Sequence, residues 1–169
     1  VAHGSEHQRS RALRTLTQAG GKLRADYTDP TKSPLSTGAP LQISAGTFEY
    51  VAPAGDNTLR LGALTGTVFS STNGLLAGVM VGGGLGDATI QSTYGGSGTQ
   101  NLIFGSTARG SAGVTLNFVP QGGVNGVTNN IRIIGNNGLF TNVIGASYYF
   151  NGSDFAAYDI NSFVRAPNY

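Results

Sequence analysis

Both histidines of the chain lie within its first seven residues, in the string His3-Gly-Ser-Glu-His7. This spacing matches a zinc-binding pattern in which two histidines on one helix face hold the metal and the glutamate is the general base. The pattern needs a rigid helix and a third ligand further along, whereas this string straddles the expected start of a helix. A Ser-His-Asp triad would need a histidine from the same segment. We therefore predict neither a zinc site nor a catalytic histidine.

The glycine-rich string Val81-Gly-Gly-Gly-Leu-Gly-Asp87 has the composition of a phosphate-binding loop. A Walker loop also needs a lysine followed by serine or threonine, but the last lysine of the chain is Lys32. A dinucleotide-binding loop needs a third glycine ahead of a helix, and Asp87 stands in its place. We predict a turn between strands here, and no cofactor.

Acidic residues are sparse after residue 32. A glycosidase needs two carboxyl groups close together, and these acids are widely separated in the sequence. Asp154 follows Asn151-Gly-Ser153, where capping of a turn is the expected role and Ca²⁺ binding the alternative. We predict no enzymatic activity and no metal site for these five acids: Glu49, Asp56, Asp87, Asp154 and Asp159.

Positive charge is concentrated at the start of the chain. Residues 1–32 hold six basic and three acidic residues, whereas residues 33–169 hold four basic and five acidic residues. A basic segment of this kind can dock on a partner protein, and a weak contact with nucleic acid or an anionic membrane is the alternative. The residues predicted to contact a partner are Arg9, Arg11, Arg14, Leu16, Lys22 and Arg24.

The elements that would carry these residues fall into two parts. Ser5 and Gln8 form a capping-box pattern, and apolar residues at helical spacing follow, so we expect a helix over about residues 6–19. Residues 25–40 hold three of the six prolines and read as an extended linker. We therefore predict an N-terminal arm over residues 1–40 and a β-domain over residues 41–169.

The body alternates short apolar runs with turn signals. Val114–Val119, for example, places Val114, Leu116 and Phe118 on one side and polar residues on the other. Asn-Gly pairs, which favour tight hairpins, separate several runs. We predict about nine strands in an antiparallel β-sandwich, jelly-roll-like, with hairpins at Asn73-Gly74, Asn125-Gly126, Asn137-Gly138 and Asn151-Gly152.

Aromatic residues gather near the end of the chain. Alternate positions are expected to pack in the core, and the others to form a contact surface for a subunit or a sugar. The predicted surface aromatics are Tyr149, Tyr158 and Tyr169.

Composition excludes several classes of protein. Only 11% of the residues are charged, against about a quarter in an average protein, so a charged helical bundle is excluded. The absence of cysteine excludes a disulfide scaffold, and no apolar run reaches the length of a membrane span. The nearly neutral body instead indicates a surface that contacts other protein, because repulsion between like charges normally keeps a small domain monomeric.

A proline-bearing arm ahead of a low-charge body rich in Gly, Asn and Thr resembles small structural proteins of virions, such as the capsid, penton and cement proteins of bacteriophages. The resemblance rests on Arg9–Arg24, the linker from Asp29-Pro30 to Ala39-Pro40, and the four Asn-Gly pairs. It implies a non-enzymatic virion component that assembles with copies of itself and other virion proteins, its arm reaching into neighbours. The alternative is a carbohydrate- or receptor-binding β-module of a fibre or adhesin, extracellular or on a cell surface, with a glycan receptor.

Overall fold

The computed structural model describes residues 16–19, 21–29, 35, 38, 41–44, 46–62, 64–66, 79–80, 86–109, 114–135 and 143–168. Within these ranges every regular element is a strand and no helix is present. The prediction of a β-rich body is therefore right. The strands do not form an antiparallel sandwich, however, because nearly all of them pair in parallel.

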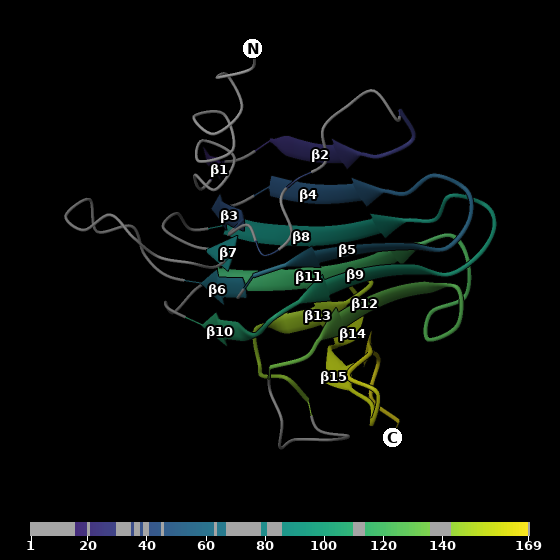
Figure 1. Cartoon of the computed structure of the whole chain (residues 1–169). Coiled ribbons are helices and arrows are strands. Elements are labelled where there is room, and N and C mark those ends of the chain that lie inside the picture. Colours follow the sequence, from purple (N-terminus) through teal and green to yellow (C-terminus); the bar gives the residue numbers. More distant parts are fainter. Residues whose placement is uncertain are drawn as a thin grey trace, which may run out of the picture.

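The largest sheet, which we call the main sheet, has six strands. Five of them are parallel and stack one above another, as Figure 1 shows, and only the last pairing, between β13 and β14, is antiparallel. From one edge to the other the strands are β2 (Lys22–Asp26), β4 (Gly46–Val51), β8 (Gly86–Thr93), β11 (Val114–Gln121), β13 (Tyr148–Phe150) and β14 (Asp154–Phe155).

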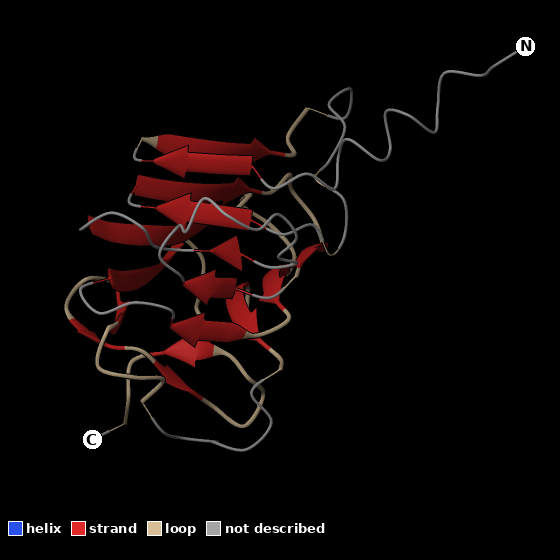
Figure 2. Cartoon of the chain, turned by 90° about the vertical axis from the view of Figure 1, so that its left-hand side faces the viewer, coloured by secondary structure: helices blue, strands red, loops and turns tan. Residues whose placement is uncertain are grey.

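The remaining strands form smaller sheets beside the main sheet (Figures 1 and 2). The second sheet is parallel and consists of β5 (Asn57–Leu61), β9 (Gln100–Phe104) and β12 (Asn129–Ile133). A third stack contains the sheet of β10 (Thr107–Arg109), β6 (Leu64–Gly66) and β7 (Val79–Met80), together with the parallel pair of β1 (Leu16–Ala19) and β3 (Leu41–Ser44). Near the C-terminus, β15 (Ala157–Tyr158) pairs with β16 (Val164–Arg165) in antiparallel fashion.

From β4 to β12 the chain passes through the main, second and third sheets in turn, so the described residues form a parallel β-solenoid. β4, β5 and β6 lie in the main, second and third sheets in turn, and β8, β9 and β10 repeat the same order. Each coil lies on the previous one in register: Val51 pairs with Thr93, and Leu59 pairs with Leu102. The predicted antiparallel jelly roll is therefore wrong, because nearly all pairings join strands of different coils in parallel, and antiparallel pairing of named strands is confined to β13–β14 and β15–β16 in the described part of the chain.

The core consists of side chains stacked in columns between the main and second sheets. Phe48, Ile90, Phe118 and Phe150 occupy matching positions on four neighbouring strands, and all four are buried. The second sheet contributes two further columns from the inward positions of its three strands. Stacking of like residues from coil to coil removes apolar surface from water without any helix. These columns are Leu59, Leu102 and Ile131, and Leu61, Phe104 and Ile133.

An amide side chain, buried in two coils and partly buried in the third, lies at the corner between the two large sheets. Asn57, Gln100 and Asn129 occupy matching positions at the start of β5, β9 and β12. Each donates its side-chain N–H groups to backbone carbonyl oxygens of the turn before it: Asn57 to Pro53 O at 3.0 Å, and Gln100 to Thr93 O at 3.0 Å. The carbonyl groups of the bends thereby accept side-chain hydrogen bonds, in addition to backbone hydrogen bonds such as that from Tyr94 N–H to Gln121 O.

The C-terminal end of the solenoid is closed by antiparallel pairs. Asn151 and Gly152 have φ values of 53° and 68°, and they connect β13 to β14 in a tight hairpin. Positive φ at both residues is the conformation that Asn-Gly favours, so this predicted hairpin is confirmed. The pair at Asn125-Gly126 instead lies in the corner between β11 and β12, and those at residues 73–74 and 137–138 lie outside the described residues.

Part of the predicted arm belongs to the solenoid. Residues 16–19 form β1, so the helix expected to extend to residue 19 is wrong there, and residues 6–15 lie outside the described residues. β2 is a strand of the main sheet, and Ala25 on it belongs to the core cluster. The division of the chain at residue 40 stays a prediction, although the main sheet includes a strand from either side of it.

Candidate functional site

A polar groove lies on the outer face of the main sheet, across β8, β11 and β13. Its volume is about 450 Å³. Thr89, Asn117 and Tyr149 occupy matching positions on these three strands, so the parallel register places one groove residue in each coil. The full set of lining residues is Asp87, Thr89, Thr115, Asn117, Tyr149 and Gly152.

Local hydrogen bonds fix the polar side chains of the groove. Thr115 Oγ1 donates to Asp87 Oδ1 across the β8–β11 pairing. Asn117 Oδ1 accepts from the backbone N–H of Gly152 at 2.8 Å, in the Asn151-Gly152 turn. Because the oxygen of this amide is held by the turn, its nitrogen is the end available to donate to a ligand. The groove therefore offers a carboxylate acceptor and an amide donor in fixed positions.

An aromatic ring stands at the β13 end of the groove. The ring of Tyr149 stacks on that of Phe155, with ring centroids 5.8 Å apart and an angle of 21° between their planes. The register of the β13–β14 hairpin causes this contact, because Tyr149 and Phe155 are paired partners. Phe155 is 42% exposed, so this aromatic pair lies at the surface rather than in the core. It forms a flat apolar surface next to hydrogen-bonding groups.

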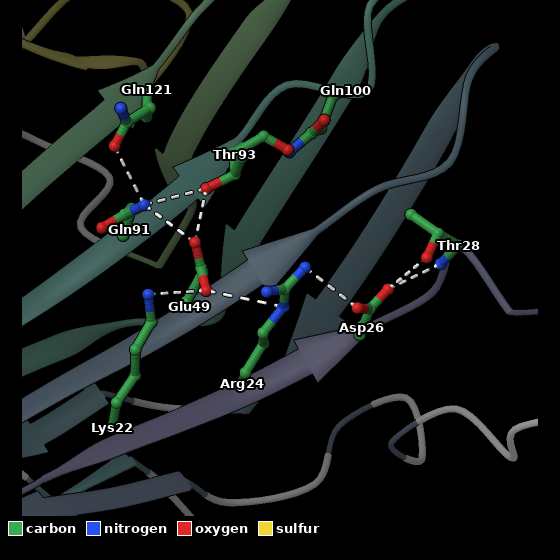
Figure 3. A network of polar contacts seen from close by, with 9 residues as sticks. All are labelled: Lys22, Arg24, Asp26, Thr28, Glu49, Gln91, Thr93, Gln100 and Gln121. Carbon is green, nitrogen blue, oxygen red and sulfur yellow. Dashed lines mark hydrogen bonds and ion pairs between the residues drawn. The ribbon is translucent and has the colours of Figure 1, made fainter.

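A network of charged and polar side chains covers the other end of the same sheet face (Figure 3). At its centre Glu49, with a side chain only 7% exposed, lies 2.8 Å from Lys22 Nζ. Its Oε1 accepts hydrogen bonds from Gln91 Nε2 and Thr93 Oγ1, both at 2.9 Å. Arg24 lies 3.7 Å from the other carboxylate oxygen. The network therefore ties β2, β4 and β8 together across the sheet.

The network keeps Glu49 ionised. Burial raises the pKa of its carboxyl group, but hydrogen bonds from Lys22 and Thr93 and the positive charges of Lys22 and Arg24 outweigh that effect and leave the pKa lowered. Lys22 and Arg24 are thereby held at the edge strand β2, and Arg24 also contacts Asp26 at 3.0 Å. Charged side chains on an edge strand discourage uncontrolled pairing with other sheets.

The predicted partner-binding residues are placed only in part. Lys22 and Arg24 lie on β2, where their side chains are 51% and 54% exposed while they contact Glu49. Leu16 lies on β1, where it pairs with Leu41. Arg9, Arg11 and Arg14 lie outside the described residues, as do His3, His7 and the string 81–85.

The predicted surface aromatics have different outcomes. Tyr149 lies in the groove, as described above. Tyr158 is buried in the core cluster, so its placement at the surface is wrong; the inward position on β15 next to Val164 explains the burial. Tyr169 lies outside the described residues.

The sequence did not predict most of the residues that line the groove. Asp87, Thr89, Thr115 and Asn117 come from two coils, and only the parallel register brings them together. The alternation of Val114–Val119 does place Thr115 and Asn117 on the outer face. Without knowledge of the register, however, nothing pointed to β8 as their neighbour.

Neither a metal centre nor a membrane span is found in the described part of the chain. No group of three or more His, Cys, Asp or Glu side chains there is close enough to hold a metal ion. The same residues include no helix with the length and apolar character needed to cross a bilayer.

The chain was compared with protein families, curated proteins and solved structures. No family model, no curated protein and no solved structure matches it.

Proposed function

We propose that this chain is a non-enzymatic binding module that holds a neutral oligosaccharide in the groove formed by β8, β11 and β13. The single observation that carries the proposal is the placement of one polar residue from each of three coils beside the stacked ring of Tyr149. This is the setting expected of a carbohydrate-binding module of a fibre or adhesin. The module would then act outside the cell, on a cell surface or on a virion.

The chemistry of the groove suits a sugar. A pyranose ring has an apolar face of C–H groups and a rim of hydroxyl groups, each of which both donates and accepts. The Tyr149 ring offers a surface for the apolar face. The Asp87 carboxylate accepts from hydroxyl groups, and the Asn117 amide donates to them. A polar groove of this size orients its ligand by a few fixed hydrogen bonds.

The acidic groups favour binding over hydrolysis. Asp87 is the single carboxylate among the residues that line the groove. Glycoside hydrolysis generally requires a pair of carboxyl groups on either side of the scissile bond. The lone carboxylate is also bonded to Thr115, which suits an acceptor of fixed orientation.

Replacing Tyr149 or Asn117 by alanine is expected to weaken glycan binding by about tenfold or more, which corresponds to about 1.4 kcal/mol. Tyr149→Ala removes the ring that stacks on the sugar, and Asn117→Ala removes the fixed amide donor. A glycan array identifies the ligand, and titration calorimetry with that glycan measures the dissociation constant of each variant.

Tyr94→Ala is the matched control, because Tyr94 is also half-buried but bonds to Gly98 O outside the groove. Its affinity should equal that of the wild type. Wild-type protein that binds no glycan on the array would contradict the proposal. The same holds if Tyr149→Ala and Asn117→Ala bind as tightly as Tyr94→Ala does.

A second proposal is that the chain is a structural component of a virion that assembles with copies of itself and with other virion proteins. The nearly balanced charge of residues 33–169, with four basic and five acidic residues, favours this role because it removes repulsion between copies. The basic residues before residue 25 would contact those partners. Light scattering tests the idea: a strict monomer at high protein concentration would contradict it. Assembly and glycan binding are compatible in a fibre.

A further inference from the structure

We propose that the groove is one part of a longer binding site, which takes a linear neutral oligosaccharide lying across the strands, with one sugar unit over each coil. This inference rests on the proposed function and names the shape and length of the ligand. The site would extend past the groove over β4 to β2, in a single column of outward residues: Tyr149, Asn117, Thr89, Thr47 and Lys22.

The register of the main sheet defines this column. Tyr149 pairs with Asn117 and Asn117 with Thr89, which accounts for the groove. Thr89 pairs in turn with Thr47, and Thr47 with Lys22. Partners in a parallel sheet project from the same face, and neighbouring strands lie about 4.8 Å apart. The groove residues are therefore continued by two further positions at the same regular spacing.

This spacing suits a polysaccharide chain. In an extended chain of linked pyranoses, each unit advances by a distance close to the separation of two strands. A chain that runs across the strands would therefore meet an equivalent side chain at each coil. Thr47 and Thr89 are short and half-buried, so they offer hydroxyl groups without blocking the path between Asn117 and Lys22.

The two ends of the column differ in chemistry. At one end the Tyr149 ring offers a flat apolar surface. At the other end Lys22 is half-exposed, and its ammonium group lies 2.8 Å from Glu49. An ammonium group has three N–H donors, so the contact with Glu49 fixes its position and leaves donors for sugar hydroxyl groups. The ion pair also balances the charge of Lys22, which keeps this end suited to a neutral ligand.

A chain-length series tests the inference. The probes are β-1,4-linked glucose and N-acetylglucosamine oligomers from disaccharide to hexasaccharide, titrated into the full chain. Affinity should rise with length up to about the pentasaccharide, one unit for each strand of the column. Thr47→Val and Lys22→Ala should weaken binding of the hexasaccharide by about tenfold. They should leave the dissociation constant of the disaccharide, which fits within the groove, unchanged.

Arg60→Ala is the control, because Arg60 is an exposed cation on the second sheet, away from the column. Thr47→Val leaves the Lys22–Glu49 pair intact, so it remains informative if Lys22→Ala unfolds more easily. Equal affinity for disaccharide and hexasaccharide would overturn the longer site while leaving the groove as a binding site. Loss of disaccharide binding in Thr47→Val would also overturn the division of the site into the groove and its continuation over β4 and β2. Failure of every oligomer to bind would overturn the longer site for a linear neutral chain, whereas the groove would fail as a glycan site only if no glycan on the array bound.

Discussion

Replacing Phe118 by alanine is expected to lower the free energy of unfolding by about 3–5 kcal/mol. Phe118 is 0% exposed and stacks in the core column between Ile90 and Phe150. Its ring also stacks on that of Tyr148, with centroids 6.5 Å apart. Truncation leaves a cavity that the neighbouring coils cannot fill, because backbone hydrogen bonds fix the distance between strands.

Urea unfolding followed by circular dichroism measures this loss, and Phe155→Ala provides the control. The same side chain is removed there, but Phe155 lies at the surface, so the loss should be about 1 kcal/mol. An equal decrease in the free energy of unfolding of the two variants would contradict the packing of Phe118 in a core column. Phe118 also adjoins Asn117 on β11, so glycan binding by Phe118→Ala should weaken even where the protein remains folded.

Replacing Asn129 by aspartate is expected to cost about 3 kcal/mol at neutral pH, although the two side chains have almost the same shape. Asn129 is 0% exposed. Its Nδ2 donates to the carbonyl oxygens of Ser92, Gln121 and Gly122 at 2.9, 3.1 and 3.0 Å. A carboxylate would place a negative oxygen against these three acceptors. The corner between β11 and β12 would lose its donors.

The effect should depend on pH. A buried carboxylate surrounded by acceptors has a raised pKa in the folded state, so its protonated form is favoured there. The loss of stability should therefore be smaller at about pH 4 than at pH 7, because protonation restores one donor and removes the charge. Urea unfolding at the two pH values measures this difference.

Asn101→Asp is the matched control. The Oδ1 of Asn101 accepts a hydrogen bond from Asn130 Nδ2 at 3.2 Å, and a carboxylate accepts equally well. Little stability should be lost in this variant at either pH. If Asn129→Asp were as stable as Asn101→Asp at neutral pH, the corner amides would not hold the turns together.

The sequence predicts where strands occur, but it does not predict which strands pair with one another. The run predicted at Val114–Val119 lies in β11. Apolar and polar residues alternate in the same way whether a strand pairs in parallel or antiparallel, so the pattern cannot decide between a sandwich and a solenoid. The Asn-Gly pairs further favoured a fold built from hairpins. The predicted hairpin is correct at Asn151-Gly152, where the solenoid ends, and wrong at Asn125-Gly126, which lies in the corner between β11 and β12.

A signal for the solenoid does exist in the sequence. Three segments share an amide residue, then apolar residues at alternate positions, then a glycine: 57–62, 100–105 and 129–135. They form β5, β9 and β12 with the turns that follow. A Cβ atom at Gly135 would clash with the backbone of Gly105 in the coil below, which explains the final glycine. The segments are separated by unequal lengths of chain, so no fixed period reveals them.

Only one residue of the groove, Tyr149, was predicted from the sequence. Tyr149 stood out as an aromatic residue at an alternate, outward position. Thr89 and Asn117 are ordinary residues of polar strand faces, and their importance arises from the register that aligns their coils. Patterns along the sequence do not show which residues align in a column across a parallel sheet, because neighbouring members of the column are separated by a whole coil.

The antiparallel closure after β13 has a consequence for association between copies. At that end, β14 has only two residues and offers almost no edge for another strand. At the opposite end, β2 has five residues and, in the described part of the chain, pairs with β4 alone. If two copies paired through β2 in spite of the charges of Lys22 and Arg24, a two-fold axis would relate them, and each copy would use the same edge of its main sheet. Growth of the main sheet by this route would stop at a dimer, because the short β14 at the other end offers a third copy almost no edge.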